Sequence, residues 1–298
     1  MLYGGKMKKT PFLCLVFIII SLVFAGASEQ KSAFSLKAAG GFGRPFPGDL
    51  DAVLDSYNSL FEDMAGRLGL SREGGLEKPA GMTDFRAELT WQFSKKVGIG
   101  LAIGRLHNQK SDRMVLLMDP LYETTLQFSR RVLAVPVEMT LTYRFLRTSR
   151  WGVYGLGGIH YCFVTFSYSM KLDENIWEYT TWSRSEGKVK DSSLGVHGGV
   201  GVSFDLSRGL GLFLEITGRN AVLNRWEGEE SYSDFEKSSE KRLGSLWRVD
   251  YSDENAGRTY STLRLAEKKP EGPGFKNVGL FKNNLSGAFL RLGLSISF

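Results

Sequence analysis

Apolar residues alternate with polar or small residues at a period of two in several stretches of the chain. Residues 84–93 show this most clearly, with Asp84, Arg86 and Glu88 on one face and large apolar side chains on the other. Successive side chains of a β-strand point to opposite faces, so the alternation predicts strands with one apolar face. A further stretch, residues 151–167, is apolar and glycine-rich on both faces, and its register is not readable. The eight predicted strands cover residues 34–43, 84–93, 97–104, 135–145, 151–167, 195–204, 210–217 and 288–298.

The connections between these strands are alternately short and long. The short ones are 94–96, 146–150 and 207–209, and the long ones are 44–81, 108–131, 168–191 and 223–284. Short periplasmic turns and long outer loops are typical of membrane barrels, and an even strand number leaves both termini on the short-turn side. The pattern predicts an all-β fold, an eight-stranded antiparallel transmembrane β-barrel. The alternative is a soluble lipocalin-like barrel, whose apolar side chains would face inward.

The first long loop contains a segment with helical periodicity. Its apolar residues recur three or four positions apart, between acidic ones, which predicts an amphipathic helix. They are Leu50, Val53, Leu54, Tyr57, Leu60, Phe61, Met64 and Leu68. We expect this stripe to pack as a lid on the barrel mouth. A helix lying in the membrane interface is the alternative, although its acidic polar face fits that less well.

The other long loops show signs of hairpins that protrude above the membrane. Residues 244–251 and 258–265 both alternate and flank the turn-forming segment 253–257. A similar hairpin is expected around 173–175. The composition agrees with many short strands, because 35 Gly and 12% aromatic residues occur without a collagen-like period.

The N-terminal segment has the features of a secretory signal. Lys6, Lys8 and Lys9 precede an apolar run over 12–24, which ends at an Ala-Gly-Ala site at 25–27. The run is shorter than the ~20 residues of a spanning helix. We therefore expect a signal peptide over 1–27 and a barrel domain over 28–298, exported by a bacterium of the Gram-negative type. Cys14 lies inside the run, which argues against a lipoprotein.

Charge and cysteine content restrict the function classes. The formal charge of +6 falls to +3 without the three signal lysines. The chain has no basic cluster interleaved with aromatics, so no nucleic-acid partner is expected. Cys162 would be the only cysteine of the mature chain, and no Cys/His spacing suits a metal. We expect no cofactor.

The end of the chain, from Gly287 to Phe298, resembles the C-terminal signal of outer-membrane barrels, with a terminal Phe after alternating apolar residues. The segments Val135-Pro-Val-Glu, Tyr143-Arg-Phe and Tyr154-Gly-Leu-Gly-Gly, within residues 34–298, resemble the outer membrane protein beta-barrel domain group, related to small OmpA/OmpX-type barrels. The resemblance implies the cell outer membrane as location, outer-membrane lipid as partner, and contact of the C-terminal strand with the barrel-assembly machinery. The residues assigned to this signal are Tyr143, Phe289 and Phe298.

Charged residues occur on the predicted inward faces of the strands. They are Lys37, Arg86, Glu88, Glu138, Arg144, His197, Glu215 and Arg291. An eight-stranded barrel is only wide enough to be filled by side chains, and buried charges need partners. The pattern predicts a salt-bridge network that plugs the lumen. From its depth along the strand, Arg291 should pair with Glu215 or, across the lumen, with Glu88. A proton or ion path is the alternative.

The evidence for catalysis is weak. His107 lies near Ser111 and Asp112 at the outer rim, where lipid-modifying barrel enzymes have their sites, but the His-x-Ser spacing of the barrel deacylases is absent. Four tryptophans of the outer loops are candidates for binding a partner or glycan, or for stapling the hairpins: Trp177, Trp182, Trp226 and Trp247. We therefore predict a non-catalytic structural or surface-binding protein with an unknown extracellular partner, and a narrow channel or transporter as the alternative.

Overall fold

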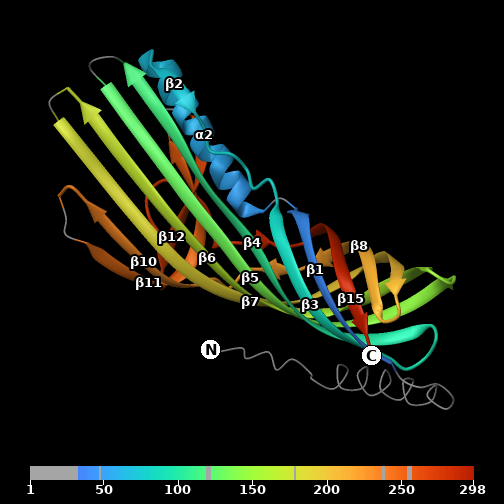
Figure 1. Cartoon of the computed structure of the whole chain (residues 1–298). Helices are drawn as coiled ribbons and strands as arrows, with labels where there is room; N and C mark the ends of the chain where they lie inside the picture. The colour runs from blue at the N-terminus through green and yellow to red at the C-terminus, as the bar shows by residue number, and fades with distance from the viewer. Residues whose placement is uncertain (1–32, 47, 119–121, 178, 237–238, 254–256) are drawn as a thin grey trace, which may run out of the picture.

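The computed structural model describes residues 33–298 except 47, 119–121, 178, 237–238 and 254–256, so the expected signal peptide lies outside the described residues. The described chain forms one helix and a series of strands (Figure 1). In chain order these are β1 (Ala33–Pro45), α2 (Asp49–Leu68), β2 (Ser71–Gly74), β3 (Met82–Gln92), β4 (Val97–Met118), β5 (Tyr122–Arg147), β6 (Trp151–Ile176), β7 (Tyr179–Ser207), β8 (Leu210–Asn220), β9 (Val222–Leu223), β10 (Glu227–Asp234), β11 (Glu240–Asp253), β12 (Arg258–Ala266), β13 (Phe275–Leu280), β14 (Asn283–Asn284) and β15 (Gly287–Ser297).

Eight strands close into an antiparallel ring. The order runs from β1 through β3, β4, β5, β6, β7, β8 and β15 back to β1. Closure pairs every strand on both sides, as a membrane requires of a sheet. The ring and its three short turns confirm the predicted eight-stranded barrel, with the C-terminus at the short-turn end (Figure 1).

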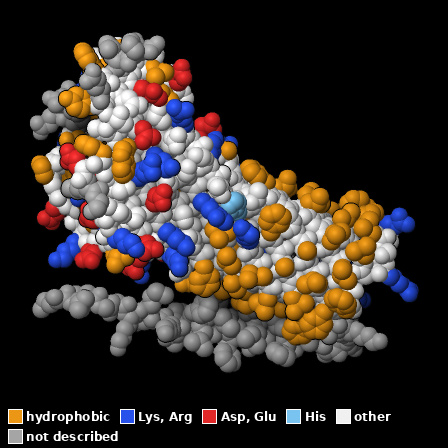
Figure 2. All heavy atoms as spheres, turned by 60° about the vertical axis from the view of Figure 1, so that its left-hand side comes forward, with side chains coloured by type: hydrophobic (Ala, Val, Ile, Leu, Met, Phe, Trp, Pro, Cys, Tyr) orange, Lys and Arg blue, Asp and Glu red, His pale blue; other side chains and the backbone are white. Residues whose placement is uncertain are grey.

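The outer surface of the ring is apolar. Phe85, Leu101 and Ile103 are 60%, 63% and 56% exposed, whereas Glu88 and Glu138 point inward and are buried. Figure 2 shows hydrophobic side chains spread over the visible face of this half of the molecule, and we call this apolar outer surface the belt. Apolar outside and charged inside is the arrangement of a transmembrane barrel and the reverse of a lipocalin-like one. Within the described residues, no helix is both long and apolar enough to span a membrane.

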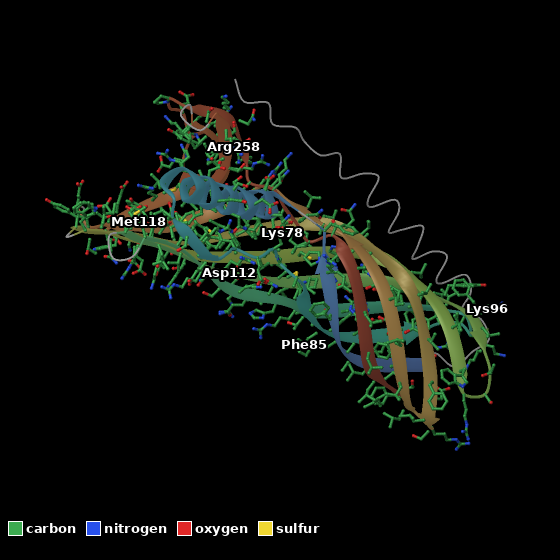
Figure 3. The ribbon with its side chains drawn as sticks, turned by 90° about the horizontal axis from the view of Figure 1, so that it is seen from above. Lys78, Phe85, Lys96, Asp112, Met118 and Arg258 are labelled. Carbon is green, nitrogen blue, oxygen red and sulfur yellow. The ribbon has the colours of Figure 1, made fainter. Side chains whose placement is uncertain are left out.

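Strands β4 to β7 continue far beyond the belt. Residues 108–131 and 168–191, expected to be loops, are mostly paired strand in the structure. With 26 residues, β6 is about 85 Å long at ~3.3 Å per residue, whereas a crossing takes ~9–11 residues. Asp173 pairs with Trp182 inside the ladder, so the turn lies beyond the expected 173–175. Figure 3 shows Met118 at the far tip and Lys96 at the opposite, short-turn end.

The upper parts of β4–β7, together with α2 and β10–β13, form what we call the extracellular extension. Helix α2 ends at Leu68 and is capped by Gly69, whose φ of 67° is left-handed. Its buried stripe, which includes Leu50, Leu54 and Phe61, joins a core shared with Phe289 of the barrel. The buried part of the stripe therefore faces protein and not a membrane interface, but α2 packs mainly on β12 and β2 and rises beside the extension (Figure 1), and Leu68 at its end is 51% exposed. The helix is thus part of the extension more than a lid on the barrel mouth. The expected hairpin of 244–251 with 258–265 is present as β11 and β12.

A polar cluster ties α2 to the hairpins of the extension. Arg248 Nη1 lies 2.8 Å from Asp49 Oδ1 of α2, and its Nε lies 3.1 Å from Asp250 Oδ1. Asp250 also accepts hydrogen bonds from Ser261 at 2.6 Å and from Asn277 at 3.2 Å. Burial raises the pKa of Asp250, but the hydrogen bonds from these three residues outweigh it and hold the pKa below its usual value.

We expect Asp250→Asn to loosen this docking by about 1–3 kcal/mol, because buried hydrogen bonds to a charged acceptor are lost. The pKa of Asp250 is lower in the folded protein than in the unfolded chain, where it is about 3.9. The stabilisation by ionised Asp250 is therefore fully present above that unfolded pKa, and it is lost as the pH falls through the pKa of the folded protein. Limited proteolysis of the extension at neutral pH should be faster for the variant. The difference in cleavage rate between the variant and the wild type should shrink in strong acid, where Asp250 is protonated. An acid-active protease is used for that measurement. Glu271→Gln, at an exposed position, is the control. Equal cleavage rates at neutral pH would contradict the assignment.

Candidate functional site

Four basic and four acidic side chains meet inside the membrane part of the barrel, among the described residues. We call them the lumen network, and their formal charges cancel, four against four. They are Lys37, Arg86, Arg219 and Arg291, with Asp84, Glu88, Glu138 and Glu215. Seven of the eight residues are buried, and Lys37 is mostly so. A buried charge without a partner of opposite sign is costly, so buried charges must be balanced and in contact with one another.

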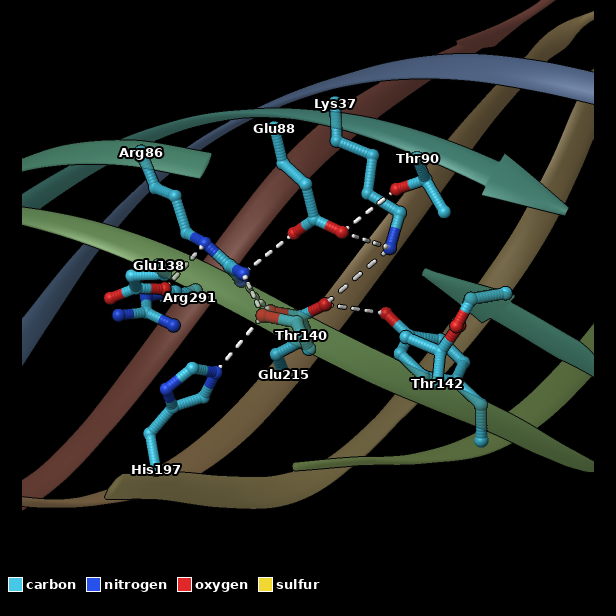
Figure 4. A network of polar contacts seen from close by, with 12 residues as sticks. Lys37, Arg86, Glu88, Thr90, Glu138, Thr140, Thr142, His197, Glu215 and Arg291 are labelled. Atoms are coloured by element: carbon cyan, nitrogen blue, oxygen red, sulfur yellow. Dashed lines mark hydrogen bonds and ion pairs between the residues drawn. The ribbon is translucent and has the colours of Figure 1, made fainter. Parts of the chain in front are cut away.

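Arg86 of β3 is at the centre of the network (Figure 4). Its Nη2 lies 2.7 Å from Glu88 Oε2 and its Nη1 lies 3.3 Å from Glu215 Oε2. Its Nε lies 3.0 Å from Glu138 Oε2, although without hydrogen-bond geometry. One guanidinium thus contacts carboxylates from three strands, β3, β5 and β8.

Hydroxyl groups and a lysine complete this centre. Tyr154 donates a hydrogen bond to Glu215 Oε1 at 2.9 Å, and Thr90 donates to Glu88 Oε1 at 2.8 Å. Lys37 Nζ lies 3.7 Å from Glu88 and 3.9 Å from Glu215. The contacts cross the lumen between strands that are not neighbours in the ring, so they occupy it at this level.

Arg291 does not form the pair that the sequence suggested. Its Nε donates to Asp84 Oδ2 at 2.6 Å, and no ion pair joins it to Glu215 or Glu88 among the described residues. Arg291 and Glu215 are register neighbours, but Gly41 of β1 lies between Arg291 and Asp84 in the same row. A Cβ on Gly41 would come within 3.0 Å of Arg291 Cγ. The missing side chain lets Arg291 cross β1 and reach Asp84.

The expected network differs from the observed one at four positions: Arg144 and His197 lie outside it, and Asp84 and Arg219 belong to it. Arg144 is half-buried and lines a cavity of about 190 Å³ at the short-turn end, which Lys37 of the lumen network also lines, but among the described residues it forms no ion pair with the network. Asp84 and Arg219 were missed. Asp84 lies on the same face of the alternating stretch 84–93 as Arg86 and Glu88, so the alternation itself indicates that it points inward. Arg219 continues the inward alternation of β8 two residues past the predicted end, and it contacts Glu138.

Two histidines lie beside the network. His197 Nε2 is 2.9 Å from Thr140 Oγ1, and its ring centroid is 5.7 Å from that of His160. Both ring nitrogens of His160, together with Nε and Nη1 of Arg219, are buried without a hydrogen-bond partner within the described part of the chain.

Above the charges the lumen becomes apolar. Along β6 the inward side chains change from Tyr154 and His160 to Cys162, Val164 and Phe166, the last three almost fully buried. A cluster that we call the ring plug follows: Phe166, Trp226 and Phe281, each fully buried, with centroids 5.9–6.1 Å apart. The interior is thus occupied at two successive levels, by ion pairs and then by packed rings.

The four candidate tryptophans of the outer loops have different environments. Trp177 is 75% exposed beside the turn between β6 and β7, with a φ of 58°. Trp182 is half-buried under Arg184, and Trp247 donates from Nε1 to the carbonyl of Ala266 at 3.1 Å. The surface role expected for Trp226 is wrong, because its chain segment folds back over the barrel mouth and buries the ring.

The residues considered for catalysis do not converge. Alternation along β4 turns His107 and Ser111 outward and Asp112 inward, where Asp112 pairs with Arg130 at 2.9 Å. Ser111 is hydrogen-bonded to Ser129 at 2.7 Å. Over the described ranges, no group of three or more His, Cys, Asp or Glu is placed to hold a metal ion.

The residues assigned to the assembly signal point in different directions, two of them outward and one into the lumen. Tyr143 and Phe298 are exposed, and Tyr143 packs edge-on against Phe145. Phe289 faces the lumen, with Arg219 and Arg291 5.2 and 6.0 Å from its ring centroid. Recognition of these residues by the assembly machinery stays a prediction, and Phe289 has a packing role besides.

No protein-family model matches the chain, and no curated protein of similar sequence was found. Solved structures of similar architecture include the outer membrane protein OprG from Pseudomonas aeruginosa (12% identity, 91% of this chain and 98% of that chain covered, TM-score 0.40). Others are Ail, the attachment invasion locus protein of Yersinia pestis (9%, 91% and 100%, 0.31), and the outer membrane protease OmpT from Escherichia coli (10%, 90% and 96%, 0.23). They assign no activity to this chain. Its closed eight-stranded ring, apolar belt and charged interior are those of a small outer-membrane β-barrel protein.

Proposed function

We propose that this protein is a closed, non-catalytic outer-membrane barrel whose extracellular extension binds a partner at the cell surface. The observation that carries the proposal is the double filling of the lumen, by the lumen network and by the ring plug, beneath an extension that rises far above the membrane. A barrel filled at both levels supplies a rigid anchor instead of a passage. Long strands then carry their hairpin tips, with Trp177 and Tyr179 75% and 77% exposed, away from the lipid.

We expect purified, folded protein to give no conductance when it is inserted into a planar lipid bilayer. Because ion pairs and packed rings occupy the lumen at two levels, insertion should give no stable conductance steps. Ala substitution of Phe281, in the ring plug, should also stay silent, because the lumen network below remains intact. Stable, large single-channel steps from the wild type would overturn the closed barrel.

Partner binding is tested on cells that display the protein. The expected result is that a ligand found by screening binds the wild type and is lost when Trp177 and Tyr179 at the hairpin tip are replaced by Ser. A matched control replaces Phe145 and Trp151, which are exposed at the short-turn end, by Ser. Unchanged binding by the tip variant, or equal loss of binding in the tip variant and the control, would contradict a role for the tip.

A narrow proton or ion path is the second candidate. It is favoured by one observation: buried polar atoms of Arg219, in the lumen network, and of His160 and His197, beside it, have no hydrogen-bond partner among the described residues. The bilayer recording distinguishes the two, because a path of this kind gives small currents that depend on these residues.

A further inference from the structure

Below the lumen network, the lumen ends in a cavity at the short-turn end of the barrel. A Cβ on Gly152 would come within 2.7 Å of Ser203 Oγ, and one on Gly211 within 2.9 Å of Ser295 Oγ, so these residues face the same space. Because the inward residues are small here, they leave a cavity of about 190 Å³. On six of the eight strands the inward residue at this level is glycine or serine: Ser35, Gly98, Gly152, Ser203, Gly211 and Ser295.

Large side chains close the cavity on the side of the lumen network. Lys37 Nζ lies 5.2 Å from the ring centroid of Tyr154 and 5.4 Å from that of Phe213, and all three residues line the cavity. The opposite side is lined by exposed residues such as Arg147 and Lys96, which lies at the short-turn end (Figure 3). The cavity is thus open to the periplasm and closed toward the extension, and the ring of strands separates it from lipid. We call it the periplasmic cup.

The periplasmic cup has an excess of positive charge. Apart from Lys37, which belongs to the balanced lumen network, its charged lining residues are Lys96, Arg144, Arg147 and Asp205. Within the part of the chain that the structure describes, Lys96 and Arg144 form no ion pair, and Arg147 Nη2 lies 4.0 Å from Asp205 Oδ2. Three cations against one carboxylate leave a net formal charge of +2.

The carboxylates above the cup do not offset this charge. Glu88 and Glu215 each lie within ion-pair distance of both Arg86 and Lys37, so they are already balanced inside the lumen network. Arg144 is half-buried in the cup without such a partner. An enclosed cation without a counter-charge is costly, and a bound anion would remove that cost.

Neutral polar groups complete the lining of the cup. Ser35, Gln92 and Ser295 line it, and none of these three side chains makes a hydrogen bond with another described residue. Their hydroxyl and amide groups are therefore available as donors to a ligand beside the guanidinium and ammonium groups.

We propose that the periplasmic cup binds a phosphate group, either as free inorganic phosphate or as the terminal group of a molecule whose remainder projects into the periplasm. A cavity of about 190 Å³ holds about six water molecules at ~30 Å³ each, and it is smaller than the ~300–1,000 Å³ of pockets that enclose a larger ligand. A phosphate monoester carries a charge of about −1.5 to −2 at neutral pH, which matches the net charge of the cup. Its oxygens accept charge-assisted hydrogen bonds, and the planar guanidinium of Arg144 can donate two in parallel. The inference is independent of the surface partner, because the cup and the extension lie at opposite ends of the barrel.

The test is isothermal titration calorimetry of the full protein, refolded in a maltoside detergent that contains no phosphate. Inorganic phosphate and glycerol phosphate are the two titrants, and we expect the wild type to bind at least one of them. The variant Lys96→Gln with Arg144→Gln should bind it about tenfold more weakly or worse, because hydrogen bonds from charged donors are lost. The matched control, Arg150→Gln with Arg208→Gln, removes the same charge from exposed short-turn positions outside the lining and should bind as the wild type does.

The two titrants distinguish the sources of the phosphate group. Binding of inorganic phosphate alone indicates an enclosed anion, and tighter binding of glycerol phosphate indicates a terminal group. Ser295→Leu keeps every charge but fills the cup, so it should also weaken binding of the preferred titrant. Heat-modifiable migration on gels verifies that each variant is folded. If the double variant does not fold, Lys96→Gln, at an exposed turn, takes its place beside Ser295→Leu and should give a partial loss.

The proposal is overturned if the wild type binds neither titrant, or if the cup variants bind as tightly as the wild type. Equal weakening in the Arg150→Gln and Arg208→Gln control would also overturn it, because the general positive charge of the short-turn end would then account for the binding. Acetate bound as tightly as phosphate would contradict a site for a doubly charged group.

Discussion

Replacing Arg86 by Met should destabilise the barrel by about 5 kcal/mol, at the upper end of the range for breaking a buried ion pair. Arg86 contacts Glu88, Glu138 and Glu215, so its loss leaves four buried carboxylates facing three cations. The measurement is urea unfolding of protein refolded in lipid vesicles, followed by tryptophan fluorescence. A large fall in the transition midpoint is expected.

A second substitution separates the charge effect from packing. Adding Glu215→Gln to Arg86→Met restores the balance to three against three, and much of the loss should be recovered. Lys95→Met removes a charge from an exposed turn and should lie within about 0.5 kcal/mol of wild type. If Arg86→Met unfolds at the wild-type urea concentration, or the double variant is no better than the single one, the charges do not act as one network.

The membrane half of the fold was predictable because lipid imposes a strict rule on each strand. Outward side chains such as Leu101 and Val137 must be apolar, and inward ones such as Glu138 are then free to be polar. The eight strands, the short turns and most of the inward charges follow from that alternation. Helix α2 was readable from its apolar stripe, because its spacing has a different period.

The extracellular extension was not predictable as strand because the alternation reverses its phase. On β4 the outward side chains are apolar up to Ile103, while above it the inward ones, such as Leu106, Met114 and Leu116, are apolar and almost fully buried. The strand continues, but its apolar face moves from the lipid to the protein core. A prediction that follows the outward apolar residues ends the strand where they end. The predicted loops are therefore longer than those of the structure.

The pairing inside the lumen depends on three-dimensional detail that no single strand carries. Depth along the strands placed Arg291 level with Glu215, which the register confirms. Depth along a strand says nothing about Gly41, which lies on a third strand. Because Gly41 has no side chain, Arg291 can reach Asp84. Trp226 is a similar case, because its burial depends on how residues 221–226 fold over the barrel mouth.

Replacing Arg291 by Met should cost about 3–5 kcal/mol, because Asp84 would keep a buried charge without its cation. The partner is identified by rescue in the same urea unfolding assay. Asp84→Asn added to Arg291→Met should recover most of the loss, since it removes the stranded charge at the observed contact. Glu215→Gln added to Arg291→Met also restores neutrality, but it acts on a carboxylate already held by Arg86 and Tyr154, so its rescue should be smaller. The two double variants carry the same net charge, so their difference measures pairing alone. Equal rescue, or better rescue by Glu215→Gln, would return Arg291 to the partner that its depth along the strand suggests.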